Sequence, residues 1–408
     1  MDYINLYQSL RNQINFDDDF ITTDHLNIYN FTFESKATAL LSGTTNYRCE
    51  DHRLNFDHCE QEFKTDMNED ELMLNTKDIQ IIDNKRFRYH IFMPENIRKT
   101  NRFILLFHGF NEKSWDKYYP WAKKLVEHTG KAVVLFPIAF HMNRAPGLWR
   151  SRYEMFELSK KRQASFPLTE HSTFSNVAIS IHVHARPQRF IWSGLQTYYD
   201  VIQLMDQIRG NNHPLFEKDT KADIFAYSIG GLLGQSLMMT NTKNYFSNSK
   251  LCLFCSGAAF NRIQAASKFI IDSEGSLALY SFLVEHLDHH LKNNPRLAHY
   301  VSEVHPEGMN LMSLINYHKM IEYREDKFRE MSDRIMAVGM KKDSVYPYYE
   351  IENTLKGISH DIPVKVNILD YDFSYKHEDP FPPNKKYEDI INEGFEQAFE
   401  LMGGFLKD

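Results

Sequence analysis

One stretch constrains the fold more than any other part of the chain: residues 222–231, which read Ala-Asp-Ile-Phe-Ala-Tyr-Ser-Ile-Gly-Gly. The apolar run 224–227 is typical of a buried strand, and the run 232–239 has the spacing of a helix. The pattern predicts a strand, a sharp turn and a helix, with the hydroxyl of Ser228 at the apex. The amino end of that helix would offer unpaired N–H groups and positive partial charge to an oxyanion. An ordinary strand-to-helix turn is the alternative at this point.

Composition favours a large globular protein without a nucleic-acid surface. The 408 residues are 42% hydrophobic and 25% charged, which is ample for a large core. A net charge of −7 argues against nucleic-acid binding. Four cysteines do not make a disulfide framework, and the amino terminus lacks a signal-peptide pattern, so we expect a cytoplasmic protein. No apolar run is long enough to span a bilayer.

Predicted strands alternate with predicted helices along most of the chain, which indicates a parallel sheet. An antiparallel hairpin opens the series, and an alternating edge strand closes it. In chain order we expect the hairpin at 79–82 and 87–92, strands at 103–107, 132–137, 224–227, 251–255, 335–339 and 364–369, and helices at 118–130, 192–208, 232–239, 347–355 and 387–405.

Partners for Ser228 follow it in the chain. Asp343 comes after strand 335–339, and His377 comes after strand 364–369, shortly before the final helix. The order Ser228, Asp343, His377 resembles that of the α/β-hydrolase superfamily, in its serine-hydrolase branch and as a bacterial-type member. One departure is Ala226, where the family pattern has glycine.

The resemblance covers about 77–140 and 190–405. It implies an α/β-hydrolase fold, with a mostly parallel central sheet flanked by helices. We expect residues 1–75 to form an N-terminal extension packed on the core. Residues 76–408 would then form the hydrolase domain, with insertions at about 141–190 and a helical cap at about 260–330.

The resemblance also implies roles for the three ordered residues. Ser228 would be the nucleophile, His377 the general base and Asp343 the acid that orients the imidazole. Asp370 and Asp372 are alternatives for the acid. A His-Gly pair after strand 103–107 implies an oxyanion hole built from the N–H groups of Phe110 and Ile229, or of Asn111 in place of Phe110.

Five residues near this predicted edge of the sheet are candidates for substrate binding. His108, Asn111 and Tyr227 flank the implied oxyanion donors, while His141 and Arg144 lie in the loop after strand 132–137. That loop lies at the carboxyl edge of the sheet, where α/β proteins bind ligands. Arg144 could pair with a substrate anion. The alternative for His141 and Arg144 is pairing with carboxylates of the protein itself.

Clusters of potential metal ligands occur, but their spacing does not favour a metal. In the first, His58 and Cys59 are adjacent, whereas zinc sites use spaced pairs, so surface and packing roles are favoured. Cys252 and Cys255 lie in an apolar strand and are expected to be inert. His182 and His184 share one strand face without a third ligand. The first cluster comprises Cys49, His52, His58 and Cys59.

The sequence therefore predicts hydrolysis of a carboxylic ester through an acyl-enzyme intermediate. The expected partner is a small acyl substrate, with no cofactor, no metal, no nucleic acid and no membrane span. Oligomeric state is not indicated. A non-catalytic protein that binds a ligand or partner, and a peptidase or amidase on the same fold, remain alternatives, with a zinc-dependent activity as a third.

Overall fold

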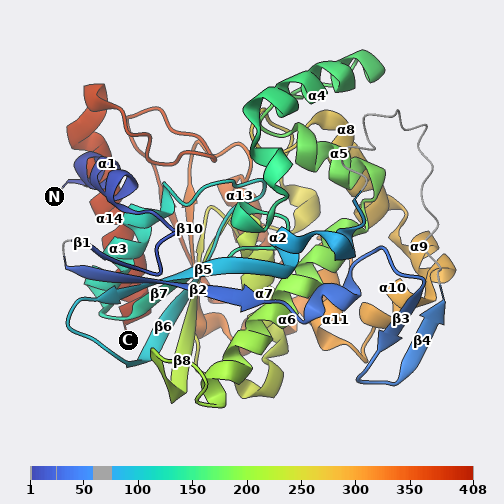
Figure 1. Ribbon diagram of the computed structural model, residues 1–408, viewed down its shortest axis with the longest axis horizontal. Helices are drawn as coiled ribbons and strands as arrows, with labels where there is room; N and C mark the ends of the chain where they lie inside the picture. Colours follow the sequence, from blue (N-terminus) through green and yellow to red (C-terminus); the bar gives the residue numbers. More distant parts are fainter. Residues whose placement is uncertain (1, 24, 58–75, 408) are drawn as a thin grey trace.

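A nine-stranded mixed sheet lies at the centre of the described chain (Figure 1). The computed structural model describes residues 2–23, 25–57 and 76–407. The strand order is β1-β2-β5-β7-β6-β8-β9-β10-β11. The pairs β1–β2, β2–β5 and β5–β7 are antiparallel. The remaining neighbours, from β7 through β6, β8, β9 and β10 to β11, pair in parallel. Their bounds are β1 (Phe20–Thr23), β2 (Leu26–Glu34), β5 (Arg86–Pro94), β6 (Thr100–Phe107), β7 (Ala132–Leu135), β8 (Phe216–Tyr227), β9 (Leu251–Phe254), β10 (Ile335–Met340) and β11 (Lys365–Leu369).

The central parallel strands are buried on both faces because helices cover each side of the sheet. Side chains alternate along β6, so Ile104 and Leu106 pack into one core while Phe103 and Leu105 pack into the other. Helices α1, α3 and α14 cover the first face, and α6 and α7 cover the second (Figure 1). These helices are α1 (Tyr3–Gln13), α3 (Tyr118–Thr129), α14 (Glu388–Lys407), α6 (Arg189–Arg209) and α7 (Gly230–Thr240).

This arrangement confirms the predicted fold class, an α/β-hydrolase sheet of mostly parallel strands flanked by helices. The predicted helices at 118–130 and 192–208 are observed as α3 and α6. The predicted edge strand is β11, which pairs with β10 alone. A short helix, α13 (Tyr348–Leu355), connects these two strands on the chain.

The predicted hairpin at 79–92 is wrong in its first half. Residues 78–80 form a 3₁₀ turn and α2 (Ile82–Lys85) forms a helical turn, while β5 pairs instead with β2, where Tyr89 lies opposite Phe31. β2 occupies the edge that the first strand of the hairpin would need. Asn84 is also buried, and its amide group bonds to Gln196 and Arg144. Residues 20–34 therefore add two strands to the main sheet.

The insertion after β7 is helical, with α4 (Arg152–Ser165) and α5 (Val177–Ala185). His182 and His184 lie on α5 and not on a strand, so residues two apart do not share a face. The strand interpretation fails because α5 is apolar almost all round, so its burial hides the helical period.

A set of short helices lies between β9 and β10, and we call them the cap helices. Pro295 and Pro306 begin two of them, a position where a missing N–H costs nothing. A separate two-stranded hairpin, β3 (Asn46–Cys49) with β4 (Leu54–Asp57), lies beside them (Figure 1). The cap helices are α8 (Ser273–Tyr280), α9 (Leu287–Asn293), α10 (Pro295–Tyr300), α11 (Pro306–Ser313) and α12 (Ile321–Glu330).

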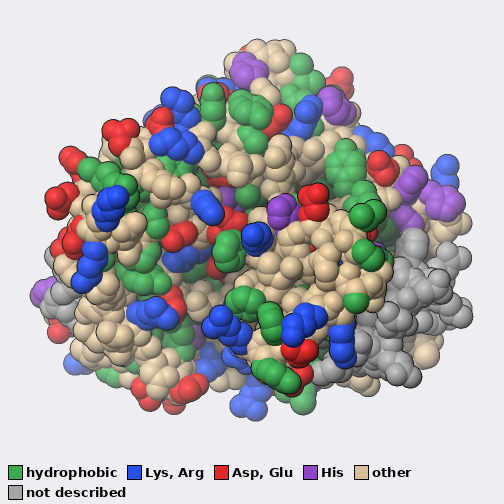
Figure 2. Space-filling model, turned by 90° about the horizontal axis from the view of Figure 1, so that it is seen from above, with side chains coloured by type: hydrophobic (Ala, Val, Ile, Leu, Met, Phe, Trp, Pro, Cys, Tyr) green, Lys and Arg blue, Asp and Glu red, His purple; other side chains and the backbone are tan. Residues whose placement is uncertain are grey.

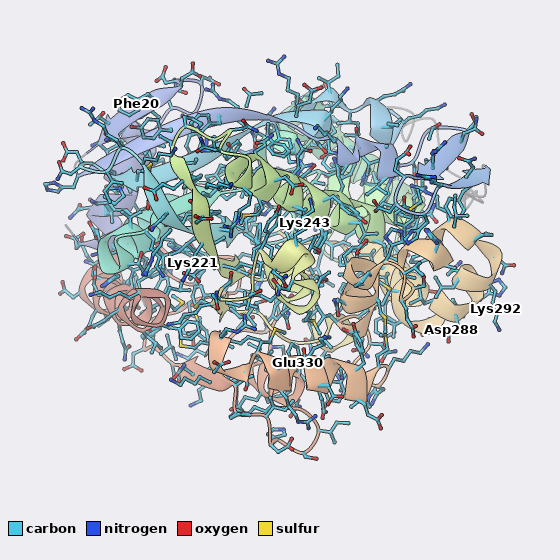
Figure 3. All side chains as sticks on the ribbon, turned by 90° about the horizontal axis from the view of Figure 1, so that it is seen from below. Phe20, Lys221, Lys243, Asp288, Lys292 and Glu330 are labelled. Carbon is cyan, nitrogen blue, oxygen red and sulfur yellow. The ribbon has the colours of Figure 1, made fainter. Side chains whose placement is uncertain are left out.

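The outer surface carries charges of both signs. Figure 2 shows Lys and Arg side chains interspersed with Asp and Glu over one face. Figure 3, which views the molecule from the opposite side, shows Phe20 of the edge strand β1 and Glu330 of α12 at opposite sides of the view. Among the described residues, no helix is both long and apolar enough to cross a membrane.

One buried ion pair joins the amino ends of the parallel strands to the last helix. Lys131 Nζ lies 2.7 Å from Asp223 Oδ2 and also donates to the carbonyl of Leu406. The two side chains are only 4% and 10% exposed. Asp223 Oδ1 accepts a second hydrogen bond, from the N–H of Lys250 at 2.8 Å. Removing either charge would leave the other buried without its ionic partner.

We expect Lys131→Met to lower the free energy of unfolding by about 3–5 kcal/mol, because Asp223 would keep an uncompensated charge. Combining it with Asp223→Asn should restore part of the loss. Urea unfolding at constant m-value measures both effects. The control is Lys319→Met, whose partner Asp288 (Figure 3) is 73% exposed, with an expected loss of at most about 1 kcal/mol. Equal losses in Lys131→Met and the control would contradict the prediction.

Candidate active site

Ser228 stands at a sharp turn between β8 and α7. Its backbone lies in the left-handed region, with φ of 56°. A non-glycine residue pays for this conformation in strain, and such residues gather at functional sites. Its N–H donates to the carbonyl of Phe254 at 3.2 Å, and its carbonyl accepts from the hydroxyl of Ser256 at 2.5 Å. The neighbouring strand β9 and the loop after it therefore hold the strained turn in place.

Glycines allow α7 to start directly after the serine. A Cβ at Gly230 would lie 2.8 Å from the carbonyl oxygen of His108, and one at Gly231 would lie 1.9 Å from Ser256 Oγ. Ala226, which stands where the hydrolase pattern has glycine, is accommodated in the same way. A Cβ at Gly234 would approach the methyl group of Ala226 to 3.3 Å. The bare backbone at 234 thus leaves room for the methyl that replaces the expected glycine.

The three predicted catalytic side chains lie in one hydrogen-bonded chain. His377 Nε2 lies 2.7 Å from Ser228 Oγ, and His377 Nδ1 lies 2.8 Å from Asp343 Oδ2. All three residues are buried. Ser228 follows β8, Asp343 follows β10 and His377 follows β11, so parallel strands deliver them to the same edge of the sheet.

Two tyrosine rings lie nearly parallel to the imidazole of His377. The rings of Tyr227 and Tyr346 stack on it with centroid distances of 5.4 and 5.3 Å and interplanar angles of 13° and 16°. The Tyr227 hydroxyl also donates to the backbone carbonyl of His377. Sequence analysis named Tyr227 but missed Tyr346. Its position three residues after Asp343, in the same loop, is the signal that could have identified it.

Asp343 is held so that one of its oxygens faces the imidazole. Its Oδ1 accepts hydrogen bonds from the N–H groups of Val345 and Tyr346 at 2.8 and 2.9 Å, which leaves Oδ2 for His377. The alternative acid Asp370 lies elsewhere, in ion pairs with Lys341 and Lys342 at the surface. The geometry therefore favours Asp343 over Asp370 as the acid.

The implied oxyanion donors border the same space as the serine. Phe110 and Ile229 line a largely apolar cavity together with Ser228. Within the described residues, neither of their backbone N–H groups is hydrogen bonded to another protein group. Two free N–H groups beside a serine hydroxyl can donate hydrogen bonds to a substrate oxygen on which negative charge develops.

His108 supports this loop from behind. Its Nδ1 lies 2.8 Å from the carbonyl oxygen of Gly109, and its Nε2 accepts from the N–H of Ile138 at 2.9 Å. Burial lowers the pKa of His108 well below its usual value. His108 is fully buried, and both of its ring nitrogens contact the backbone, so it holds the loop in place; its predicted contact with substrate stays a prediction.

Asn111 and Tyr227 line a second cavity, of about 260 Å³, which also contains Ser228 and His377. Asn111 adopts a left-handed backbone with φ of 60°. Its side-chain amide donates to the carbonyls of Ser175 at 2.9 Å and Phe269 at 2.6 Å. Asn111 thus joins the loop to segments from both predicted insertions.

His141 borders a third cavity, an apolar one that shares Phe110 and Ile229 with the site. Its Nδ1 lies 2.8 Å from the carbonyl oxygen of Ala139, and its Nε2 is buried without a partner among the described residues. Burial lowers the pKa of His141 to about 4. The imidazole is therefore neutral at pH 7.

Arg144 is not available to a substrate anion, which corrects that prediction. Its guanidinium is fully buried and lies 2.8 Å from Asp200 Oδ2, with further hydrogen bonds to Asn84 and to the carbonyl of Pro137. Asp200 in turn accepts from the hydroxyl of Ser35. This is the pairing within the protein that the sequence left open as the alternative.

The cysteines in β9 and directly after it show the expected inert environment. Cys252 and Cys255 are buried, and burial raises the pKa of both thiols. Of the first predicted ligand cluster, His58 and Cys59 lie outside the described residues. Cys49 and His52 lie beside two histidines of the cap segment, His299 and His305.

We expect the buried neutral His141 to make stability depend on pH. Its folded pKa of about 4 lies below the unfolded value of about 6.5, so the stability it contributes is present above pH 6.5 and is lost as pH falls toward 4. His141→Asn removes the titration, and the wild type should lose about 3 kcal/mol more than the variant between pH 7 and pH 4. Urea unfolding across this range measures the difference, and parallel curves would contradict the prediction.

Several solved structures are similar to the chain. Carboxyl esterase 2 from the mycorrhizal fungus Tuber melanosporum is 12% identical over 79% of this chain and 83% of its own, with a TM-score of 0.42. A thermostable esterase from Pseudomonas putida is 8% identical over 99% and 88%, also at 0.42. The peroxisomal α/β-hydrolase Lpx1 from Saccharomyces cerevisiae is 11% identical over 93% and 91%, at 0.38.

Among curated proteins no match is found. A family model described as "Family of unknown function (DUF6051)" matches residues 1–407. Because this match spans nearly the whole sequence, the chain belongs to the DUF6051 family.

Proposed function

We propose that the protein is a serine hydrolase that cleaves a carboxylic ester through an acyl-enzyme intermediate. The observation that carries this proposal is the hydrogen-bonded chain from Ser228 through His377 to Asp343 at a strained strand-to-helix turn. A serine hydroxyl is a weak nucleophile at neutral pH and needs a base within hydrogen-bonding reach. The base in turn needs a carboxylate that holds the correct tautomer.

In the proposed first step, Ser228 Oγ attacks the ester carbonyl carbon while His377 Nε2 takes the hydroxyl proton. The carbonyl oxygen becomes an oxyanion and accepts hydrogen bonds from the N–H groups of Phe110 and Ile229. Asp343 stabilises the imidazolium that forms. The carbon–oxygen bond to the alcohol then breaks, and His377 returns its proton to the departing alcohol.

In the second step, a water molecule replaces the alcohol. His377 takes a proton from the water as its oxygen attacks the acyl carbon, and a second oxyanion forms at the same donors. The bond to Ser228 Oγ then breaks, the serine recovers its proton from His377, and the carboxylic acid leaves. The proton cycle closes without a cofactor.

The cavity walls support an apolar acyl group. Phe190, Phe260 and Ile263 line the cavity shared by Ser228 and Ile229. The second cavity, on the side of His377, contains Asn111, Glu112 and Lys113 and is more polar. We therefore place the acyl chain in the first cavity and the alcohol in the second. The tightness of the first cavity, about 30 Å³, favours a short acyl chain.

We expect a fluorophosphonate probe to label the native protein at Ser228, because the probe phosphorylates an activated serine hydroxyl. The labelled residue is identified by mass spectrometry of peptides. Ser228→Ala should abolish labelling, whereas Ser159→Ala, on the surface helix α4, should not change it. Undiminished labelling in Ser228→Ala would refute the assignment of the nucleophile.

We expect Asp343→Asn to reduce kcat by about 10⁴-fold with little change in KM, because the amide stabilises the wrong imidazole tautomer. His377→Ala should cost at least about 10²-fold. Short-chain chromogenic esters supply the assay, and matched anilides test the amidase alternative. The control is Asp370→Asn, another carboxylate near the end of the sheet, which should keep wild-type turnover. If Asp343→Asn turned over as fast as this control, the acid would lie elsewhere.

A further inference from the structure

Four potential metal ligands converge at a point outside the candidate active site. They are Cys49 Sγ and one ring nitrogen each of His52, His299 and His305, and all four atoms lie within 4.8 Å of one another. In sequence they form two spaced pairs, 49 with 52 and 299 with 305. Two spaced pairs of Cys and His ligands are the usual arrangement of a structural zinc site.

We propose that Cys49, His52, His299 and His305 bind one Zn²⁺ ion. The ion would take four protein ligands in tetrahedral geometry, with no position open to a substrate, and its role would be structural. Binding requires the Cys49 thiol to release its proton as the zinc–sulfur bond forms, and the three imidazoles bind as neutral rings. No electron is transferred.

The distances between the ligand atoms fit such an ion. Cys49 Sγ lies 3.4 Å from His52 Nδ1 and 3.3 Å from His305 Nε2, and the Nε2 atoms of His305 and His299 are 3.1 Å apart. Zinc bonds of about 2.3 Å to sulfur and 2.0–2.1 Å to nitrogen place tetrahedral ligands about 3.3–3.6 Å apart. These three distances lie within a few tenths of an ångström of that spacing, and all four atoms lie within 4.8 Å of one another.

A carboxylate prepares the most buried histidine for metal. His305 Nδ1 lies 2.7 Å from Glu307 Oε1, so this nitrogen carries the proton and Nε2 keeps its lone pair facing the thiol. Tyr199 donates to the same carboxylate oxygen. A carboxylate behind a ligating imidazole is the common support of metal-binding histidines.

The burial of the four ligands and their access to solvent also suit a zinc ion. Cys49 and His305 are buried, while His52 is exposed and His299 is half-buried. A surface cavity of about 640 Å³ reaches Cys49, Tyr199 and Tyr300 and offers a route from solvent. Burial on one side protects the thiolate, and the exposed His52 can be the last of the four ligands to bind the ion.

The proposed site would fasten two parts of the chain that are distant in sequence. Cys49 ends β3 and His52 lies in the turn before β4, whereas His299 lies in α10 and His305 just before α11. Figures 1 and 3 both show this hairpin beside the cap helices α9 and α10. Arg296 of α10 lies over the ring of Tyr47 in β3 at 3.6 Å, so the same two parts already pack together.

The test begins with the full-length wild-type protein, freed of any histidine tag and dialysed against metal-free buffer. Elemental analysis by mass spectrometry should find about one zinc per chain. After chelation, added Co²⁺ should give the visible bands of tetrahedral cobalt and a thiolate charge-transfer band in the near ultraviolet. Zinc below about one-tenth per chain together with no tetrahedral cobalt spectrum would overturn the proposal.

Variants then locate the ion. Cys49→Ser should lose the thiolate band, and His305→Ala should lower bound zinc at least about tenfold. The control is His289→Ala, an exposed histidine on the cap helix α9 and outside the cluster, which should bind zinc like the wild type. Circular dichroism establishes that each variant is folded. Because the wild-type cobalt spectrum does not depend on any variant, a misfolded variant leaves the test intact. Full zinc content in folded Cys49→Ser and His305→Ala would overturn the assignment, whether or not the protein hydrolyses esters.

Discussion

The candidate active site depends on how closely α7 can approach the sheet. The hydrogens that replace side chains at Gly230 and Gly231 let the helix begin within contact distance of β6 and of the loop after β9. The chain can then reverse within one residue, and Ser228 must take the left-handed conformation to do so. The strain is offset by the hydrogen bonds that its own N–H and carbonyl make. A wider turn would relax the serine and carry its hydroxyl away from the imidazole.

Asp343 and His377, the two partners of Ser228, do not need a left-handed backbone. Asp343 and His377 lie in loops after adjacent parallel strands, and parallel strands end at the same edge of the sheet. What these residues need is orientation. The tyrosine rings stacked on the imidazole of His377, and the two N–H groups that donate to Asp343 Oδ1, supply this orientation before any substrate arrives. Burial strengthens each of these interactions, because little water competes for them.

Local patterns predicted the fold well for strands that are buried uniformly along an apolar run. The run 103–107 is apolar throughout and forms β6, buried on both faces. The same reasoning misread 79–82, because the place beside β5 is taken by β2, a strand in which apolar and polar residues mix. It also misread His182, since a helix buried on all sides has no visible period. The partner of Arg144 is Asp200, 56 residues away, and no local pattern indicates such a pair.

The sequence predicts the cluster around Ser228 but not the cluster around Cys49, because the two clusters are assembled in different ways. Ser228, Asp343 and His377 each follow a strand, and the topology of a parallel sheet brings strand ends together whatever lies between them. Cys49 and His305 are separated by 256 positions, and no topological rule relates a small hairpin to a loop between cap helices. The sequence alone therefore groups Cys49 and His52 only with their neighbours His58 and Cys59. A ligand set split between two such segments becomes visible only when their packing is known, since each pair alone is too small to hold an ion.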